Sequence, residues 1–216
     1  MRIAFFTDTF LPQLNGIVVS TIEVAKKLAD RGNSVFIIAP NSGRKETFSY
    51  PGVTVKRCAS IPTFIYQDYK FTAPISPMIL KFVLENKTDI IHIQTTFTVG
   101  LQGMLIAKLL KLPLVGSYHT FFADPQYLKH FRFNSELMRN IVWATTRLHY
   151  NRCDLVVCSS KGVRDELVAK GIRKPIKIIP SGVNASVFDN TKAALVRRKY
   201  ARGSREKLAL FVGRLA

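Results

Sequence analysis

The sequence predicts an α/β fold with a Rossmann-like open sheet, mostly parallel, that carries helices on both faces. Short β-rich apolar runs alternate with longer segments of helical period, which is typical of repeated βαβ units. Most of these runs are apolar at every position, as in strands whose two faces are both covered by helices. A chain of 216 residues with 47% hydrophobic content suffices for one domain of this kind.

The expected elements follow one another from the first residues onward. The first helix is expected to begin at Ile17 and to end at Gly32. Its apolar residues have the spacing of one helical face and fall into two rows: 17, 21, 24, 28 and 18, 22, 25, 29. Further helices are expected at 76–86, 101–110, 135–151, 161–170 and 193–200. The expected strands are 2–7, 34–39, 53–57, 90–94, 114–118, 155–159 and 176–179.

The charge balance favours anionic partners. Lys and Arg total 32 against 14 Asp and Glu, a formal charge of +18, which suits nucleic acid, acidic lipid surfaces or phosphorylated small molecules. Three cysteines without a CxxC pair support neither a disulfide framework nor a zinc site and indicate a reducing compartment. The apolar runs are too short for a signal peptide or a membrane helix, so any membrane contact is expected to be peripheral.

The loop after the first strand is a candidate anion site. It ends in Asn15 and Gly16 at the start of the first helix, where free N–H groups and the positive end of the helix dipole favour a phosphate. Gly16 would let a ligand approach the backbone closely. An equally good interpretation from spacing is that Asn15 only caps the helix.

His119 and Thr120 follow the strand 114–118, at an edge of the sheet where ligands of open parallel sheets bind. A neutral imidazole offers one donor and one acceptor to a sugar hydroxyl. The alternative is a structural histidine bonded to a loop carbonyl.

The segment 129–152 is predicted to be amphipathic. At 100° per residue, a core-facing stripe contains Phe133, Leu137, Ile141, Ala144 and Leu148. The opposite side gathers basic residues around an aromatic one: Lys129, Arg132, Arg139, Trp143 and Arg147. Such a face is typical of a helix at an anionic membrane surface, and the alternative is a solvated basic face with Trp143 partly packed.

Several motifs, in this order and spacing, resemble those of retaining glycosyltransferases of the GT-B architecture (family 4, group 1), notably those that glycosylate lipids of the diacylglycerol type. They lie along the whole chain: 10–12 with 15–16, 89–94, 119–120, 179–184 with Phe188, and 211–215. The resemblance implies an N-terminal acceptor-binding domain over 1–190 and a basic linker or helix over 191–207. Residues 208–216 are expected to form a strand after this basic stretch, which would begin a truncated C-terminal donor-binding domain. The alternative is an edge strand added to the first sheet.

The resemblance also implies roles for individual residues. Gly16 would lie beside the donor's pyrophosphate, His119 would contact the transferred sugar, and Arg214 would neutralise the departing diphosphate. Thr120 and the segment containing Ser181, Gly182 and Asn184 would line the cleft, although Asn184 stands where the family usually has an acidic residue. Enzymes of this kind generally need no metal or cofactor, and none is expected here.

The expected function is therefore transfer of a hexose from a nucleotide-diphosphate sugar to an acceptor, with retention of configuration, by a cytoplasmic protein peripheral to the inner face of the plasma membrane. The acceptor is expected to be a membrane lipid. One alternative is a soluble sugar or sugar-phosphate acceptor. An alternative of another class is a non-catalytic nucleic-acid-binding domain; no recognition motif supports it, so no nucleic-acid partner is expected.

Overall fold

The computed structural model describes residues 1–44, 48–63, 70–119, 136–182, 193–201, 203 and 206–209. The chain divides into two compact units, Met1–Ser181 and Gly182–Ala216. The described part of the second unit contains helix α7 (Ala193–Tyr200), which lies where the sequence predicts a helix. The expected strand at 208–216 falls almost entirely outside the described residues.

The first unit contains a seven-stranded sheet in the order β3-β2-β1-β6-β7-β8-β9, and every neighbouring pair is parallel. Strand order reverses between β1 and β6, so this is the topological switch point where open sheets bind ligands. The strands are β1 (Arg2–Phe6), β2 (Ser34–Pro40), β3 (Val53–Cys58), β6 (Ile90–Ile93), β7 (Leu114–Tyr118), β8 (Leu155–Cys158) and β9 (Ile176–Ile178).

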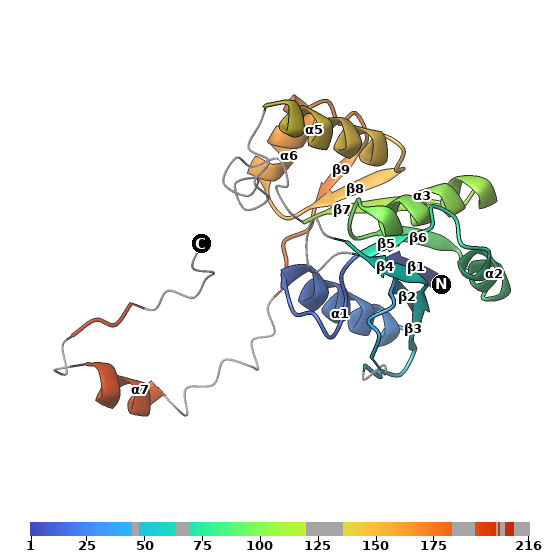
Figure 1. Ribbon diagram of the computed structural model, residues 1–216. Helices are drawn as coiled ribbons and strands as arrows, with labels where there is room; N and C mark the ends of the chain where they lie inside the picture. Colours follow the sequence, from blue (N-terminus) through green and yellow to red (C-terminus); the bar gives the residue numbers. More distant parts are fainter. Residues whose placement is uncertain are drawn as a thin grey trace. The chain divides into compact units, whose positions relative to one another are not determined.

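Helices cover both faces of the sheet (Figure 1). Alternate residues of β1 show the division: Ile3 and Phe5 pack with α1, whereas Ala4 and Phe6 pack in the larger cluster with α2, α3, α5 and α6. The helices are α1 (Gly16–Ala29), α2 (Pro77–Glu85), α3 (Thr98–Leu110), α5 (Glu136–Tyr150) and α6 (Lys161–Ala169). The α/β fold class is confirmed.

Each strand and helix predicted up to residue 200 is present, with ends that differ by a few residues at most. The prediction missed a small antiparallel sheet of β4 (Ser60–Pro62) and β5 (Lys70–Thr72). Three-residue strands are too short to show an alternating pattern. In α1, the row with Val18 and Ala25 is buried as expected, but Val24 of the other row is 43% exposed.

The buried carboxylate of Asp8 joins the loop after β1 to the start of α3. Its oxygens accept N–H groups from Phe97 (3.1 Å), Val99 (2.6 Å) and Gly100 (3.3 Å), and the Thr95 hydroxyl donates to it at 2.5 Å. An anionic side chain thus occupies the N-terminus of α3, where the helix dipole favours negative charge. Burial raises the pKa of Asp8, and these hydrogen bonds act in the opposite direction.

Helix α5 packs with the reverse of its predicted orientation. The described part of the stripe expected in the core is on the surface, with Leu137 71%, Ile141 46% and Leu148 44% exposed, and Phe133 lies outside the described residues. Trp143, expected among the exposed basic residues, is 7% exposed, and Tyr150 is 3% exposed. The reason lies in the sheet: a side chain at Gly116 would collide with the Tyr150 ring, so this glycine leaves room for the aromatic residue.

Replacing Asp8 by Asn should destabilise the domain strongly. The amide would turn one acceptor into a donor that faces the backbone N–H groups of α3, a loss expected to cost about 2–4 kcal/mol of unfolding free energy. Urea unfolding checks this. Asp165→Asn is the control, because Asp165 is half-exposed and its ion pair with Arg164 should contribute about 0.5 kcal/mol. Equal losses in the two variants would contradict the role assigned to Asp8.

Candidate functional site

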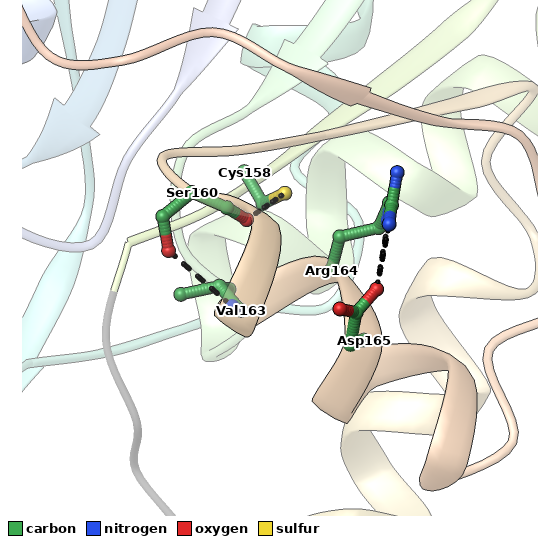
Figure 2. A network of polar contacts seen from close by, with 5 residues as sticks. All are labelled: Cys158, Ser160, Val163, Arg164 and Asp165. Atoms are coloured by element: carbon green, nitrogen blue, oxygen red, sulfur yellow. Dashed lines mark hydrogen bonds and ion pairs between the residues drawn. The ribbon is translucent and has the colours of Figure 1, made fainter.

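The candidate site lies at the carboxyl ends of the strands, where the loops after β1, β6 and β8 lead into α1, α3 and α6. These helices begin at the same edge of a parallel sheet, so their N-terminal dipole ends gather there. Asp8 occupies the start of α3. The start of α6 is capped by the Ser160 hydroxyl, which accepts the Val163 N–H at 3.3 Å, beside the Arg164–Asp165 ion pair (Figure 2).

Asn15 caps α1, as one of the two interpretations of the sequence proposed. Its side-chain oxygen accepts the Val18 N–H at 3.0 Å, and its amide nitrogen donates to the Thr9 hydroxyl at 2.9 Å. Gly16 is exposed, and no heavy atom lies within 4 Å of the position that a Cβ would take. The start of α1 is therefore open to a ligand, and donor binding by Asn15 and Gly16 stays a prediction.

Two polar pairs join β6 to β7 near this edge. His119 Nε2 lies 2.8 Å from the side-chain oxygen of Gln94, which is 4% exposed. His92 Nε2 lies 2.8 Å from the Ser117 hydroxyl. When the Gln94 oxygen accepts, Nε2 carries the proton and Nδ1 of His119 is an acceptor. A buried amide thus fixes the direction of the His119 ring.

Both histidines are neutral at physiological pH. Desolvation lowers the pKa of His92 to about 3, with a further contribution from the nearby His119. His119 keeps an exposed surface, yet desolvation of its ring lowers its pKa to about 4. A ring with this pKa serves as a hydrogen-bond partner for a neutral hydroxyl and supplies no permanent positive charge.

Some predicted site residues fall outside the described ranges: Thr120, Lys129, Arg132, Asn184 and Arg214. Ser181 and Gly182 are exposed and stand at the boundary between the two units. Their predicted role in lining a cleft stays a prediction.

Only part of the basic face predicted for α5 lies on the surface of the described structure. Trp143 is buried and lies under Lys170, whose Nζ is 5.6 Å from the indole ring centre, so its predicted exposure among the basic residues is wrong. Arg139 is half-buried, and exposed Arg147 has a guanidinium nitrogen 3.4 Å from the Lys170 carbonyl oxygen. The described surface of α5 therefore combines arginine with exposed Leu137, Ile141 and Leu148.

A comparison of the sequence with protein-family models finds a match that covers most of the chain. Residues 14–187 match the model of Glycosyltransferase Family 4. This chain belongs to Glycosyltransferase Family 4. The match includes Asn15, Gly16 and His119, and it covers most of the first unit.

Curated relatives of this family 4 chain align with almost all of it. An alpha-monoglucosyldiacylglycerol synthase of Streptococcus pneumoniae is 30% identical over 97% of this chain and 46% of the relative. A GDP-mannose-dependent alpha-mannosyltransferase of Corynebacterium glutamicum is 26% identical over 100% of this chain and 52% of the relative. The chain spans about half the length of the relatives it matches.

Solved structures agree on the fold of the family 4 domain. The sucrose-phosphate synthase of Thermosynechococcus elongatus matches with a TM-score of 0.60 at 12% identity, covering 90% of this chain and 52% of that one. The catalytic domain of starch synthase IV from Arabidopsis thaliana matches with a TM-score of 0.51 at 13% identity, over 95% and 60%. The Rossmann-like fold predicted for the N-terminal half of a GT-B protein is thereby confirmed.

Sequence reasoning assigned no role to two side chains that organise the candidate site, Asp8 and Gln94. Asp8 had a usable signal, since a carboxylate between Thr7 and Thr9 directly after a buried strand must find hydrogen-bond donors. Gln94 ends the motif 89–94, but its pairing with His119 had no signal, because the two residues are 25 positions apart.

Among the described residues we also looked for metal-binding groups, reactive thiols and membrane-spanning helices. Within these ranges, no group of three or more His, Cys, Asp or Glu residues is placed to hold a metal ion. The cysteines are buried thiols, and burial raises the pKa of Cys58 to about 11 and that of Cys153 to about 12. None of the helices described is long and apolar enough to cross a membrane.

The free energy of unfolding should fall as pH falls from about 6.5 toward 4. His92 and His119 stay neutral in the folded protein, whereas each binds a proton near pH 6.5 when unfolded, so the unfolded state takes up more protons in this window. His92 alone contributes a slope of about 1 kcal/mol per pH unit. Urea unfolding between pH 7.5 and 4.5 measures the slope, and His92→Gln should make it shallower. An identical slope in this variant would contradict the assignment.

Proposed function

We propose that this chain is the acceptor-binding half of a glycosyltransferase that moves a hexose from a nucleotide-diphosphate sugar to an acceptor, with retention at the anomeric carbon. Membership of Glycosyltransferase Family 4 supports the reaction class. The observation that carries the proposal is the pairing of Gly16, at the open start of α1, with a neutral His119 held by Gln94 at the same edge of the sheet.

These groups have complementary roles in the proposed reaction. The start of α1 stabilises the diphosphate of the donor, because the positive end of the helix dipole lies where negative charge grows as the sugar departs. His119 Nδ1 accepts a hydrogen bond from a hydroxyl of the transferred sugar, and Gln94 holds the ring in that orientation. Neither role requires a proton to leave His119, which agrees with the lowered pKa of its ring.

Removing the imidazole should slow the reaction in the protein that carries this chain. We expect His119→Ala to lower kcat/KM about 100-fold, the effect of losing one aligned hydrogen-bond partner at the reacting sugar. The assay offers radiolabelled nucleotide sugars with micelles of diacylglycerol and phosphatidylglycerol and, separately, with soluble sugars and sugar phosphates, and NMR of the product reads the anomeric configuration. Ser34→Ala, at an exposed residue that begins β2 at the opposite edge of the sheet, is the control. Inversion, or full activity without His119, would contradict the proposal.

The acceptor is proposed to be a membrane lipid, reached from the surface of an anionic bilayer. One relative is named an alpha-monoglucosyldiacylglycerol synthase, and this chain has a formal charge of +18. Helix α5 offers the contact surface: Leu137, Ile141 and Leu148 are exposed along one stripe, with Arg147 beside them. Aliphatic side chains enter the headgroup boundary, while arginine interacts with lipid phosphates.

An acidic residue in this stripe should weaken binding to anionic vesicles. We expect Leu148→Asp to reduce sedimentation with phosphatidylglycerol vesicles about tenfold, since the carboxylate is repelled by the surface and the apolar contact is lost. Leu84→Asp is the matched control, because Leu84 of α2 is also exposed, at 53%. Equal binding to anionic and neutral vesicles at low salt would overturn the lipid part and favour a soluble acceptor. Comparable, steeply salt-dependent binding to nucleic acid would favour the nucleic-acid alternative.

A further inference from the structure

A small cavity lies at the carboxyl ends of β1, β2 and β3. It has a volume of about 70 Å³ and is lined by the loop after β1, the end of β2, Arg57 at the end of β3, and Lys70 on β5. This space is larger than one water molecule needs and suits a compact ligand group. The lining residues used below are Asp8, Phe10, Asn41, Arg57 and Lys70.

The cationic wall of the cavity is held in place by hydrogen bonds. The Arg57 guanidinium donates to the carbonyl oxygens of Leu11 at 2.6 Å and Pro40 at 3.0 Å, and it lies 5.3 Å from the Phe10 ring centre. An arginine with a fixed direction loses little conformational freedom on binding, and its charge persists at every physiological pH. The guanidinium is therefore a rigid positive element of the wall.

Lys70 brings a second positive charge from a different part of the chain. Its Nζ donates to the Asn41 carbonyl oxygen at 2.5 Å, which places the ammonium at the rim formed by the end of β2. An ammonium has three N–H donors, of which this carbonyl takes one. The backbone carbonyl of Lys70 accepts the Thr98 hydroxyl at 3.1 Å, so β5 is anchored to the start of α3.

The acidic residue of the lining, Asp8, does little to cancel these charges. Its oxygens are directed at the first N–H groups of α3, and the Thr98 hydroxyl lies 3.4 Å from one of them. A carboxylate with this many donors and a helix dipole has its charge balanced locally. Arginine and lysine therefore determine the sign of the potential in the cavity.

We propose that this cavity binds a compact oxyanion, a phosphoryl group of the acceptor, between Arg57 and Lys70. The inference rests on the proposed function, because it assigns the anionic group to the acceptor side of the transferase. It names a chemical class that can come from a lipid headgroup or from a soluble sugar phosphate. Arginine and lysine from separate elements line this cavity, and both side chains donate strong charge-assisted hydrogen bonds to oxyanions.

The first test measures binding of inorganic phosphate to the whole chain by calorimetry at low salt, without any donor. Lys70→Gln should weaken binding about tenfold by removing one charge-assisted hydrogen bond. Asn41→Asp should weaken it at least as much, because it adds a negative charge at the rim in an isosteric side chain whose oxygen still accepts the Gly43 N–H. Lys27→Gln is the control: this lysine lies in the last turn of α1, at the opposite end of the sheet, and its variant should bind within about twofold of the parent.

The second test identifies the source of the phosphoryl group by sedimentation with phosphatidylglycerol vesicles against phosphatidylcholine vesicles. Parallel losses of phosphate and vesicle binding in Lys70→Gln and Asn41→Asp assign the cavity to a lipid headgroup. Loss of phosphate binding alone assigns it to a soluble phosphate. Unchanged phosphate binding in both variants, or no saturable binding to the parent chain, overturns the proposal.

These binding measurements test the cavity proposal independently of the proposed reaction. Phosphate binding that depends on Lys70, in a protein without transferase activity, would overturn the proposed function and leave the anion site in place. Transferase activity on an acceptor without phosphate, unaffected by Lys70→Gln, would overturn the cavity assignment and leave the proposed function in place.

Discussion

The hydrogen bonds of the Asp8 carboxylate are the constraint on which this edge of the domain depends. A buried charge is costly unless donors surround it, and Asp8 finds them in the first turn of α3 and in the hydroxyl of Thr95. The loop after β1 and the loop after β6 are thereby fixed to each other across the switch point. Gly100 makes this possible, because a Cβ there would collide with the Thr95 carbonyl.

The same carboxylate reaches the acceptor side of the proposed site through Thr98. The Thr98 hydroxyl lies near Asp8, donates to the Lys70 carbonyl, and accepts the Thr72 N–H at 3.2 Å. A single buried anion therefore orders the start of α3 and, through one hydroxyl, the short strand that carries Lys70. Structural and ligand-binding roles are linked in one set of contacts, so a variant of Asp8 should disturb both.

The sequence predicted the sheet well because its strands are buried on both faces, and such apolar runs can be recognised without knowing their neighbours. It also predicted the edge at which Gly16 and His119 lie.

The face of α5 that packs against the core could not be predicted in this way. An aliphatic stripe at 137, 141 and 148 has the same spacing whether it faces the core or the surface, and the choice depends on the space that Gly116 leaves for Tyr150. The Gln94–His119 pair and the cavity beside Arg57 likewise require knowledge of which strands are neighbours.

The β4–β5 hairpin differs from the rest of the domain in how it is attached. It forms its own two-stranded sheet, outside the seven-stranded ladder, and its hydrogen bonds to the rest of the domain include those of Thr98 and Asn41. Its length and side chains can therefore change without shifting the register of any strand in the main sheet. In a family whose members differ in what they glycosylate, such a hairpin is a place where acceptor preference can diverge while the edge with the proposed site is inherited unchanged.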